Sequence, residues 1–178
     1  MKIIAIIPAR GGSKRLPRKN IREVNGKPMI YWAIKACQES NYGIEAWVTS
    51  EDEEILSIAV DSFAKVIKRP AYLADDETPK QYTISHALEL FEEDPPDIVI
   101  SLQANSPGIK SEMLDLGIAK LLKYDRQEIF SVDLNGIQNG AFRIMRYPYA
   151  LQKDLSTNCG IIVCDLIDVH EEKDLEAL

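Results

Sequence analysis

The sequence has no long apolar segment. No window approaches the roughly 18 consecutive apolar residues that a membrane-spanning helix requires, and the first apolar run, residues 3–8, is followed at once by Arg10. That run also lacks the basic start and the small-residue cleavage site of a signal peptide. We therefore expect a cytoplasmic protein with no membrane partner.

Cysteine and histidine are scarce as well. Cys37, Cys159 and Cys164 form an odd set without a CxxC pair, and only His86 and His170 could complete a zinc site with them. This excludes a disulfide framework and disfavours a structural zinc centre. Buried, reduced thiols are the expected state.

Positive charge is in the minority but unevenly placed. The net charge is −7, from 28 acidic and 21 basic residues, which argues against general affinity for nucleic acid. Six basic residues nevertheless fall within thirteen positions that contain no acid: Arg10, Lys14, Arg15, Arg18, Lys19 and Arg22. A dense cationic segment in an acidic protein indicates a site for a small, highly charged anion.

The hydrophobic pattern predicts one α/β domain over residues 1–178, with helices packed on a mostly parallel sheet. Short apolar runs predict strands over 2–8, 45–49, 64–67 and 97–102. Helical spacing alternates with them over 28–39, 51–60, 78–92 and 111–123, with Pro28 in the first turn of its helix. The pattern then weakens, predicting strands over 128–133, 141–145 and 160–164 and a closing helix over 171–178.

Residues 8–20 leave the first predicted strand at its carboxyl end, where ligands bind in open α/β sheets. Gly11 and Gly12 can take backbone angles closed to other residues and can bring main-chain N–H groups close to an anion. Neither GxGxxG nor the Walker A pattern fits this segment. We therefore expect a phosphate-binding loop of another type, the alternative being a solvated basic surface loop.

Specific motifs in this segment carry a family resemblance. Ile7-Pro-Ala-Arg-Gly-Gly-Ser-Lys14, followed by Pro17, Lys19 and Asn20, resembles the signature of the acylneuraminate (CMP-sialic acid synthetase type) cytidylyltransferases. Further similar segments are residues 25–34, 48–52, 69–70, 102–103, 106–107, 139–141, 167–168 and 174–175. The resemblance extends over nearly the whole chain.

The resemblance implies a three-layer Rossmann-like nucleotidyltransferase fold and transfer of CMP from CTP to an acidic, nonulosonic-type sugar, with release of pyrophosphate. It implies catalytic roles for Arg10, Lys14 and Lys19. Nucleotide-binding roles follow for Pro8, Ala9, Gly11, Gly12, Ser13, Asn20 and Arg69, with main-chain groups near Pro8 and Ala9 reading the base. Gln103 and Asn139 would bind the sugar, and Asp168 would hold Mg²⁺.

The chain departs from the family pattern in two informative places. His170 stands where the family has a second carboxylate, and imidazole is a poor ligand for magnesium. An excursion between Val132 and Asn139, which in relatives contributes to a homodimer and to the sugar site, is absent. Two alternatives therefore stay open. One is a cytidylyltransferase for another sugar, such as a deoxy-octulosonate or a surface-polysaccharide precursor. The other is a nucleotide-binding homologue that has lost catalysis.

Overall fold

A computed structural model describes residues 1–75, 77–154 and 156–178. Its centre is a seven-stranded sheet with the strand order β5-β4-β1-β6-β8-β7-β9. The strands are β1 (Ile3–Pro8), β4 (Glu45–Ser50), β5 (Lys65–Lys68), β6 (Ile98–Leu102), β7 (Glu128–Val132), β8 (Gln138–Arg146) and β9 (Cys159–Val163). Only β8 runs antiparallel to its neighbours, so the predicted, mostly parallel sheet is confirmed.

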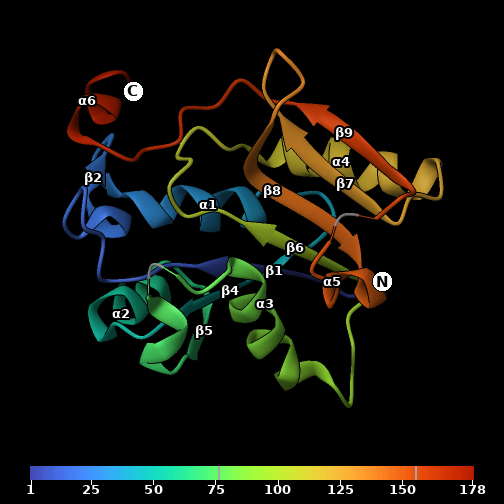
Figure 1. The fold of residues 1–178 in the computed structure, drawn as a ribbon, viewed down its shortest axis with the longest axis horizontal. Helices are drawn as coiled ribbons and strands as arrows, with labels where there is room; N and C mark the ends of the chain where they lie inside the picture. Colours follow the sequence, from blue (N-terminus) through green and yellow to red (C-terminus); the bar gives the residue numbers. More distant parts are fainter. Residues whose placement is uncertain (76, 155) are drawn as a thin grey trace.

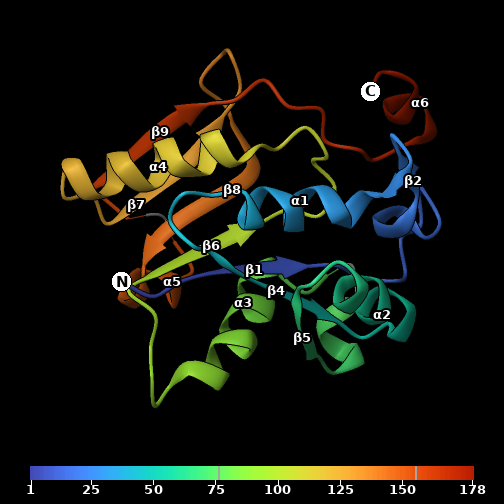
Figure 2. The ribbon, with the colours of Figure 1, turned by 180° about the vertical axis from the view of Figure 1, so that it is seen from behind.

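Helices cover both faces of the sheet. The apolar side chains of β1 alternate: Ile3, Ala5 and Ile7 pack with the helices of one face, whereas Ile4 and Ile6 pack with α3. The first face carries α1 (Met29–Gln38), α2 (Glu53–Asp61) and α4 (Ser111–Lys123). The opposite face carries α3 (Lys80–Leu88) and the short α5 (Tyr147–Ala150). Figures 1 and 2 show α1 and α3 on opposite sides of β1.

The predicted helices are present: α4 has the predicted ends, and the others differ at one or both ends. Pro28 lies outside the first turn of α1, because its ψ of 140° is extended, and it serves as the N-cap residue. Residues 89–91 form a 3-10 turn, η3 (Glu89–Phe91), after α3 ends at Leu88. Asp52 caps α2 by accepting hydrogen bonds from the N–H groups of Glu54 and Ile55. Within the described ranges, no helix combines the length and the apolarity needed to cross a bilayer.

The tail of the chain packs beside the segment that follows the basic loop. After β1, the chain forms η1 (Lys19–Ile21) and a small hairpin of β2 (Glu23–Val24) and β3 (Lys27–Pro28). The closing helix α6 (Glu172–Glu176) lies next to this hairpin (Figure 1). A satellite core joins them, in which Val169 and Leu175 pack with Leu16 and Val24. The tail before α6 is thereby held at the carboxyl end of the sheet.

A tight turn occupies the interval between Val132 and Asn139, where the resemblance predicts that an excursion is absent. The Asp133 carboxylate accepts hydrogen bonds from the N–H groups of Asn135 and Ile137, at 2.8 and 2.9 Å. Gly136 has a φ of +79°, a conformation that glycine adopts without strain. Strands β7 and β8 are therefore joined directly as a hairpin.

Candidate functional site

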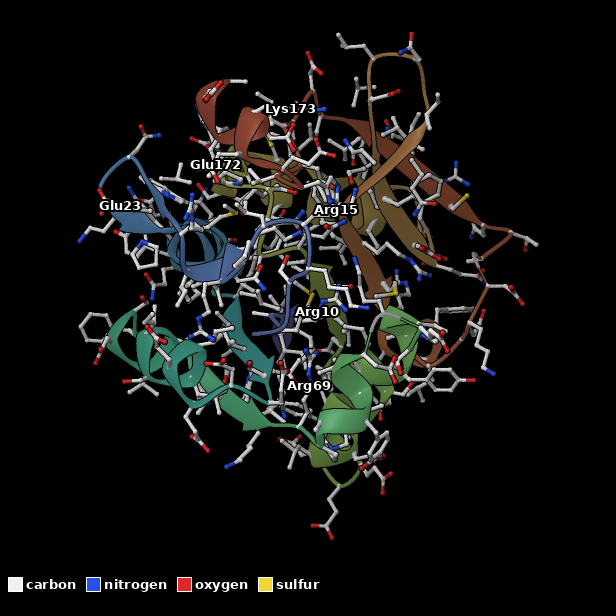
Figure 3. All side chains as sticks on the ribbon, turned by 60° about the vertical axis from the view of Figure 1, so that its left-hand side comes forward. Arg10, Arg15, Glu23, Arg69, Glu172 and Lys173 are labelled. Atoms are coloured by element: carbon white, nitrogen blue, oxygen red, sulfur yellow. The ribbon has the colours of Figure 1, made fainter. Side chains whose placement is uncertain are left out.

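A hollow of about 310 Å³ opens at the carboxyl ends of β1 and β6. The structure brings seven of the predicted site residues to its walls: Pro8, Arg10, Ser13, Lys19, Asn20, Arg69 and Gln103. Gly12 and Lys14 line an adjoining space that shares Arg10 with this hollow. Figure 3 shows Arg10 and Arg69 facing the same central region, with Arg15 farther along the loop. The strand ends thus gather residues that are up to 95 positions apart in the sequence.

The hollow is strongly cationic. Four of its lining side chains are positive, namely Arg10, Lys19, Arg69 and Lys80, and Asp75 is the one acid among the described lining residues. Loss of surrounding water lowers the pKa of Lys19 and of Lys80, and neighbouring arginines lower both further. Lys80 reaches solvent, yet protein atoms crowd its ammonium group inside the hollow. Such a site favours a polyanion, which supplies the charge that the walls lack.

Glu51 connects the basic loop to Arg69. Its Oε1 accepts the N–H of Gly11 at 2.8 Å, and its Oε2 accepts Nη2 and Nε of Arg69 at 3.0 and 3.2 Å. The Arg69 side chain is only 3% exposed, and this burial lowers its pKa against the opposing effect of Glu51. The guanidinium is therefore fixed in position at the wall of the hollow.

The two loop glycines differ from each other in the structure: Gly11 has a packing role that the sequence did not predict, whereas the predicted approach of the Gly12 N–H to an anion stays a prediction. Neither has a positive φ, so the expectation of backbone angles closed to other residues was wrong. A Cβ at Gly11 would lie 2.2 Å from Oδ2 of Asp52, whereas one at Gly12 would meet nothing within 4 Å. Gly11 is thus required for close packing on the start of α2, and its N–H already binds Glu51.

Part of the cationic cluster is neutralised by acids from other elements. Arg18, in the left-handed conformation with φ of 57°, pairs with Asp52 and Glu54. Its hydrogen bond holds the pKa of Asp52 below the usual range. Arg22 pairs with Glu172 of α6. These two arginines anchor the loop to α2 and to the tail, and neither lines the hollow.

Ala9 and Asn20 support the loop. The N–H of Ala9 donates to the Thr49 carbonyl at 3.0 Å, which extends the pairing of β1 with β4 and leaves that amide unable to read a base. The Asn20 side chain is buried, and its Nδ2 donates to the Arg10 carbonyl at 2.9 Å. This bond sets the path of the main chain that carries Arg10.

The two predicted sugar-binding residues are placed differently. Gln103 lines the hollow, with its Nε2 donating to the Gly140 carbonyl at 2.6 Å. Asn139 is not among the described lining residues. Its Nδ2 donates to the Cys164 carbonyl at 2.8 Å, and its Oδ1 accepts from the Ser131 hydroxyl at 2.6 Å. Asn139 therefore ties β8 to β7 and to the end of β9, and its contact with a sugar stays a prediction.

Asp168 lies on the tail beside the hollow. Its Oδ1 accepts the Ser106 hydroxyl, and its Oδ2 lies 3.8 Å from Nε2 of His170, which lines the hollow. Asp168 also acts electrostatically on Lys19 and Lys80. Nowhere in the described ranges do three carboxylate, imidazole or thiol groups gather as a metal site. Magnesium commonly takes one or two protein carboxylates together with substrate phosphates and water. Asp168 supplies one such carboxylate, so these residues fit that mode of binding and not a site made of protein ligands only.

Sequence reasoning missed Lys80, Thr83 and Asn105, all of which line the hollow. The sequence does contain one indication that Lys80 is a site residue. It follows Pro79 at the start of a helical pattern, where a cation opposes the positive end of the helix dipole. A lysine at this position does not stabilise the helix, which indicates that it has a different role.

The three thiols are unpaired, as expected. Burial raises the pKa of Cys37 to about 12 and also raises that of Cys164. Cys159 is only half-buried, so complete burial of all three thiols was wrong.

Comparison with known proteins gives one consistent family. A family model described as cytidylyltransferase matches residues 4–148. The chain is 35% identical over 130 residues to N-acylneuraminate cytidylyltransferase A of Danio rerio, a match that covers 73% of this chain and 30% of that protein. It is 34% identical over 134 residues to pseudaminic acid cytidylyltransferase of Campylobacter jejuni, covering 74% and 58%. The matches thus span only 30% and 58% of the length of these two relatives.

A solved structure, CMP:2-keto-3-deoxy-manno-octonic acid synthetase complexed with CTP, superposes with a TM-score of 0.77 at 16% identity. The superposition covers 99% of this chain and 96% of the other chain, so the two share the Rossmann-like nucleotidyltransferase fold. The family match ends at residue 148, before Asp168 and His170.

Proposed function

This chain belongs to the cytidylyltransferase family, and from that premise we propose that it transfers CMP from CTP to an acidic sugar of the nonulosonic type and releases pyrophosphate. The observation that carries the proposal is the hollow in which Arg10, Lys19, Arg69 and Lys80 converge against a single acid of the described lining. A nucleoside triphosphate bears nearly four negative charges, which these cations complement.

In the proposed reaction, a hydroxyl oxygen of the sugar attacks the α-phosphorus in line. The bond between the α-phosphorus and the oxygen that bridges it to the β-phosphorus breaks, pyrophosphate leaves with the electron pair, and the hydroxyl proton passes to solvent water. Arg10, Lys14 and Lys19 of the loop neutralise the charge that grows on the leaving group, and Gln103 orients the sugar. Because the hydrogen bonds of Glu51 and Asn20 already hold the loop, little reorganisation accompanies this step.

We also propose Mg²⁺ as a cofactor. Asp168 would supply the protein carboxylate, and the remaining ligands would be nucleotide oxygens and water. When bound, the ion would add charge neutralisation at the phosphates. His170, 3.8 Å from Asp168, would contact the nucleotide rather than the metal.

Pyrophosphate release tests the proposal. The protein is incubated with CTP, Mg²⁺ and, in turn, N-acetylneuraminate, pseudaminate and 3-deoxy-manno-octulosonate, and the sugar that supports release identifies the acceptor. Parallel reactions with ATP and GTP are expected to stay at background, because a hydrogen-bonded base site leaves buried groups unpaired with the wrong base. CTP binding by calorimetry without turnover on any sugar would instead favour the non-catalytic, nucleotide-binding alternative.

A further inference from the structure

The tail between β9 and α6 is fastened to the site by the loop that follows β6. Residues 164–170 form neither helix nor strand and cross from β9 to α6 (Figure 1), and Asp168 belongs to this segment. The N–H of Val169 donates to the Asn105 carbonyl at 2.9 Å, and Nδ2 of Asn105 donates to the Val169 carbonyl at 3.2 Å. The Val169 side chain is buried in the satellite core. The residue that follows Asp168 is therefore fixed by both its main chain and its side chain.

The loop between β6 and α4 is a closely packed support for this tail. The N–H of Ile109 donates to the Ser106 carbonyl at 3.1 Å, which closes a turn. A Cβ at Gly108 would lie only 3.2 Å from Cδ2 of Leu166, so the loop and the tail are in close contact. Ser106 is 1% exposed. Its packed surroundings therefore leave the Ser106 side chain little freedom to move.

The Ser106 hydroxyl holds one oxygen of the Asp168 carboxylate. It donates to Oδ1, whereas Oδ2 lies 3.8 Å from Nε2 of His170, a residue that lines the hollow. Asp168 also acts electrostatically on Lys19 and Lys80 of the hollow. Because the Asp168 side chain is 24% exposed, packing alone does not determine its rotamer. The hydrogen bond from Ser106 therefore sets the direction in which the second carboxylate oxygen faces.

We infer that Ser106 is a positioning residue for the proposed reaction: its hydroxyl turns the Asp168 carboxylate so that one oxygen is presented to the nucleotide phosphates and their Mg²⁺. The inference rests on the proposed function, since it needs the metal that Asp168 would hold. Mg²⁺ demands a nearly ideal arrangement of its ligands, and hydrogen bonds from neighbouring groups commonly orient those ligands. Ser106 is not among the described lining residues of the hollow, so it acts through Asp168.

The test measures metal binding apart from turnover. Mn²⁺ replaces Mg²⁺ as the probe, and electron paramagnetic resonance of free Mn²⁺ gives the affinity of the metal for the complex of the protein with CTP. No sugar is added, so that no transfer takes place. Ser106→Ala is expected to weaken Mn²⁺ binding about tenfold, the lower end of the effect that a hydrogen bond to a metal ligand has on metal affinity. Affinity for CTP without metal, measured by calorimetry, is expected to change less than threefold.

Control variants separate positioning from a general structural effect. Ser40→Ala is the matched control, because the Ser40 hydroxyl also donates to an aspartate, Asp115, at 2.5 Å, but Ser40 is not among the described lining residues of the hollow. It is expected to leave Mn²⁺ affinity unchanged. Ser106→Cys keeps the size of the side chain with a weaker donor and is expected to give an intermediate loss. Thermal unfolding verifies that each variant is folded.

A double-variant cycle shows whether Ser106 acts through Asp168. Asp168→Asn alone is expected to weaken Mn²⁺ binding at least as much as Ser106→Ala does, because it removes the ligand itself. Adding Ser106→Ala to Asp168→Asn is expected to cause no further loss, since the carboxylate that the hydroxyl positions is already gone.

Equal Mn²⁺ affinities of Ser106→Ala and Ser40→Ala would overturn the inference, and so would a further tenfold loss when Ser106→Ala is combined with Asp168→Asn. Unchanged Mn²⁺ affinity in Asp168→Asn would overturn it as well, by removing the ligand through which Ser106 acts. The proposed function fails on a different result, namely no pyrophosphate release by the unmodified protein with any of the three sugar acids.

Discussion

Glu51→Ala removes the carboxylate that joins the basic loop to Arg69, and we expect it to lower the free energy of unfolding by about 2–4 kcal/mol. Three hydrogen bonds are lost, one from the Gly11 N–H and two from the Arg69 guanidinium. Removing one partner of a fully buried ion pair costs about 3–5 kcal/mol, because the other charge stays buried. Glu51 is 20% exposed, so water partly replaces it and the expected loss is smaller.

The assay is urea unfolding followed by fluorescence, with Glu54→Ala as the control. Glu54 also pairs with an arginine, Arg18, but its side chain is 64% exposed, and such surface pairs contribute about 1 kcal/mol or less. The double variant Glu51→Ala, Arg69→Met is expected to recover part of the loss, because it removes the buried charge. Equal losses for Glu51→Ala and Glu54→Ala would show that the bridge does not stabilise the loop.

Five further substitutions test the site in three experiments. Gly11→Ala is expected to destabilise the protein by about 1–3 kcal/mol through overpacking, while Gly12→Ala stays within about 0.5 kcal/mol, as measured by thermal unfolding. Arg10→Ala and Lys19→Ala should each weaken CTP binding by roughly 1.5–3 kcal/mol in calorimetry, and unchanged affinity would remove them from the nucleotide site. Asp168→Asn should reduce pyrophosphate release strongly and CTP affinity little, since a metal acts mainly on charge developing in the transition state; unaltered turnover would eliminate the metal assignment.

The fold was largely readable from the sequence because its signals are local. The apolar run of β1 and the helical spacing of α1 identify their elements without knowledge of their neighbours. Strand order and the antiparallel direction of β8 were not readable, since pairing depends on contacts between distant segments.

The candidate site, too, was predicted in part from the sequence and decided in part by the tertiary structure. The basic loop was identified from its six cationic residues within thirteen positions, because residues that are close in the chain also lie close together in the structure. Tertiary structure decided which cations face the hollow: Arg18 and Arg22 turn to acids of α2 and α6, while Arg69 and Lys80 arrive from other elements. It also placed the Asn139 amide between strands. Charge and glycine content are properties of the chain itself, whereas the partner of each charged or polar group is set by segments that only folding brings together.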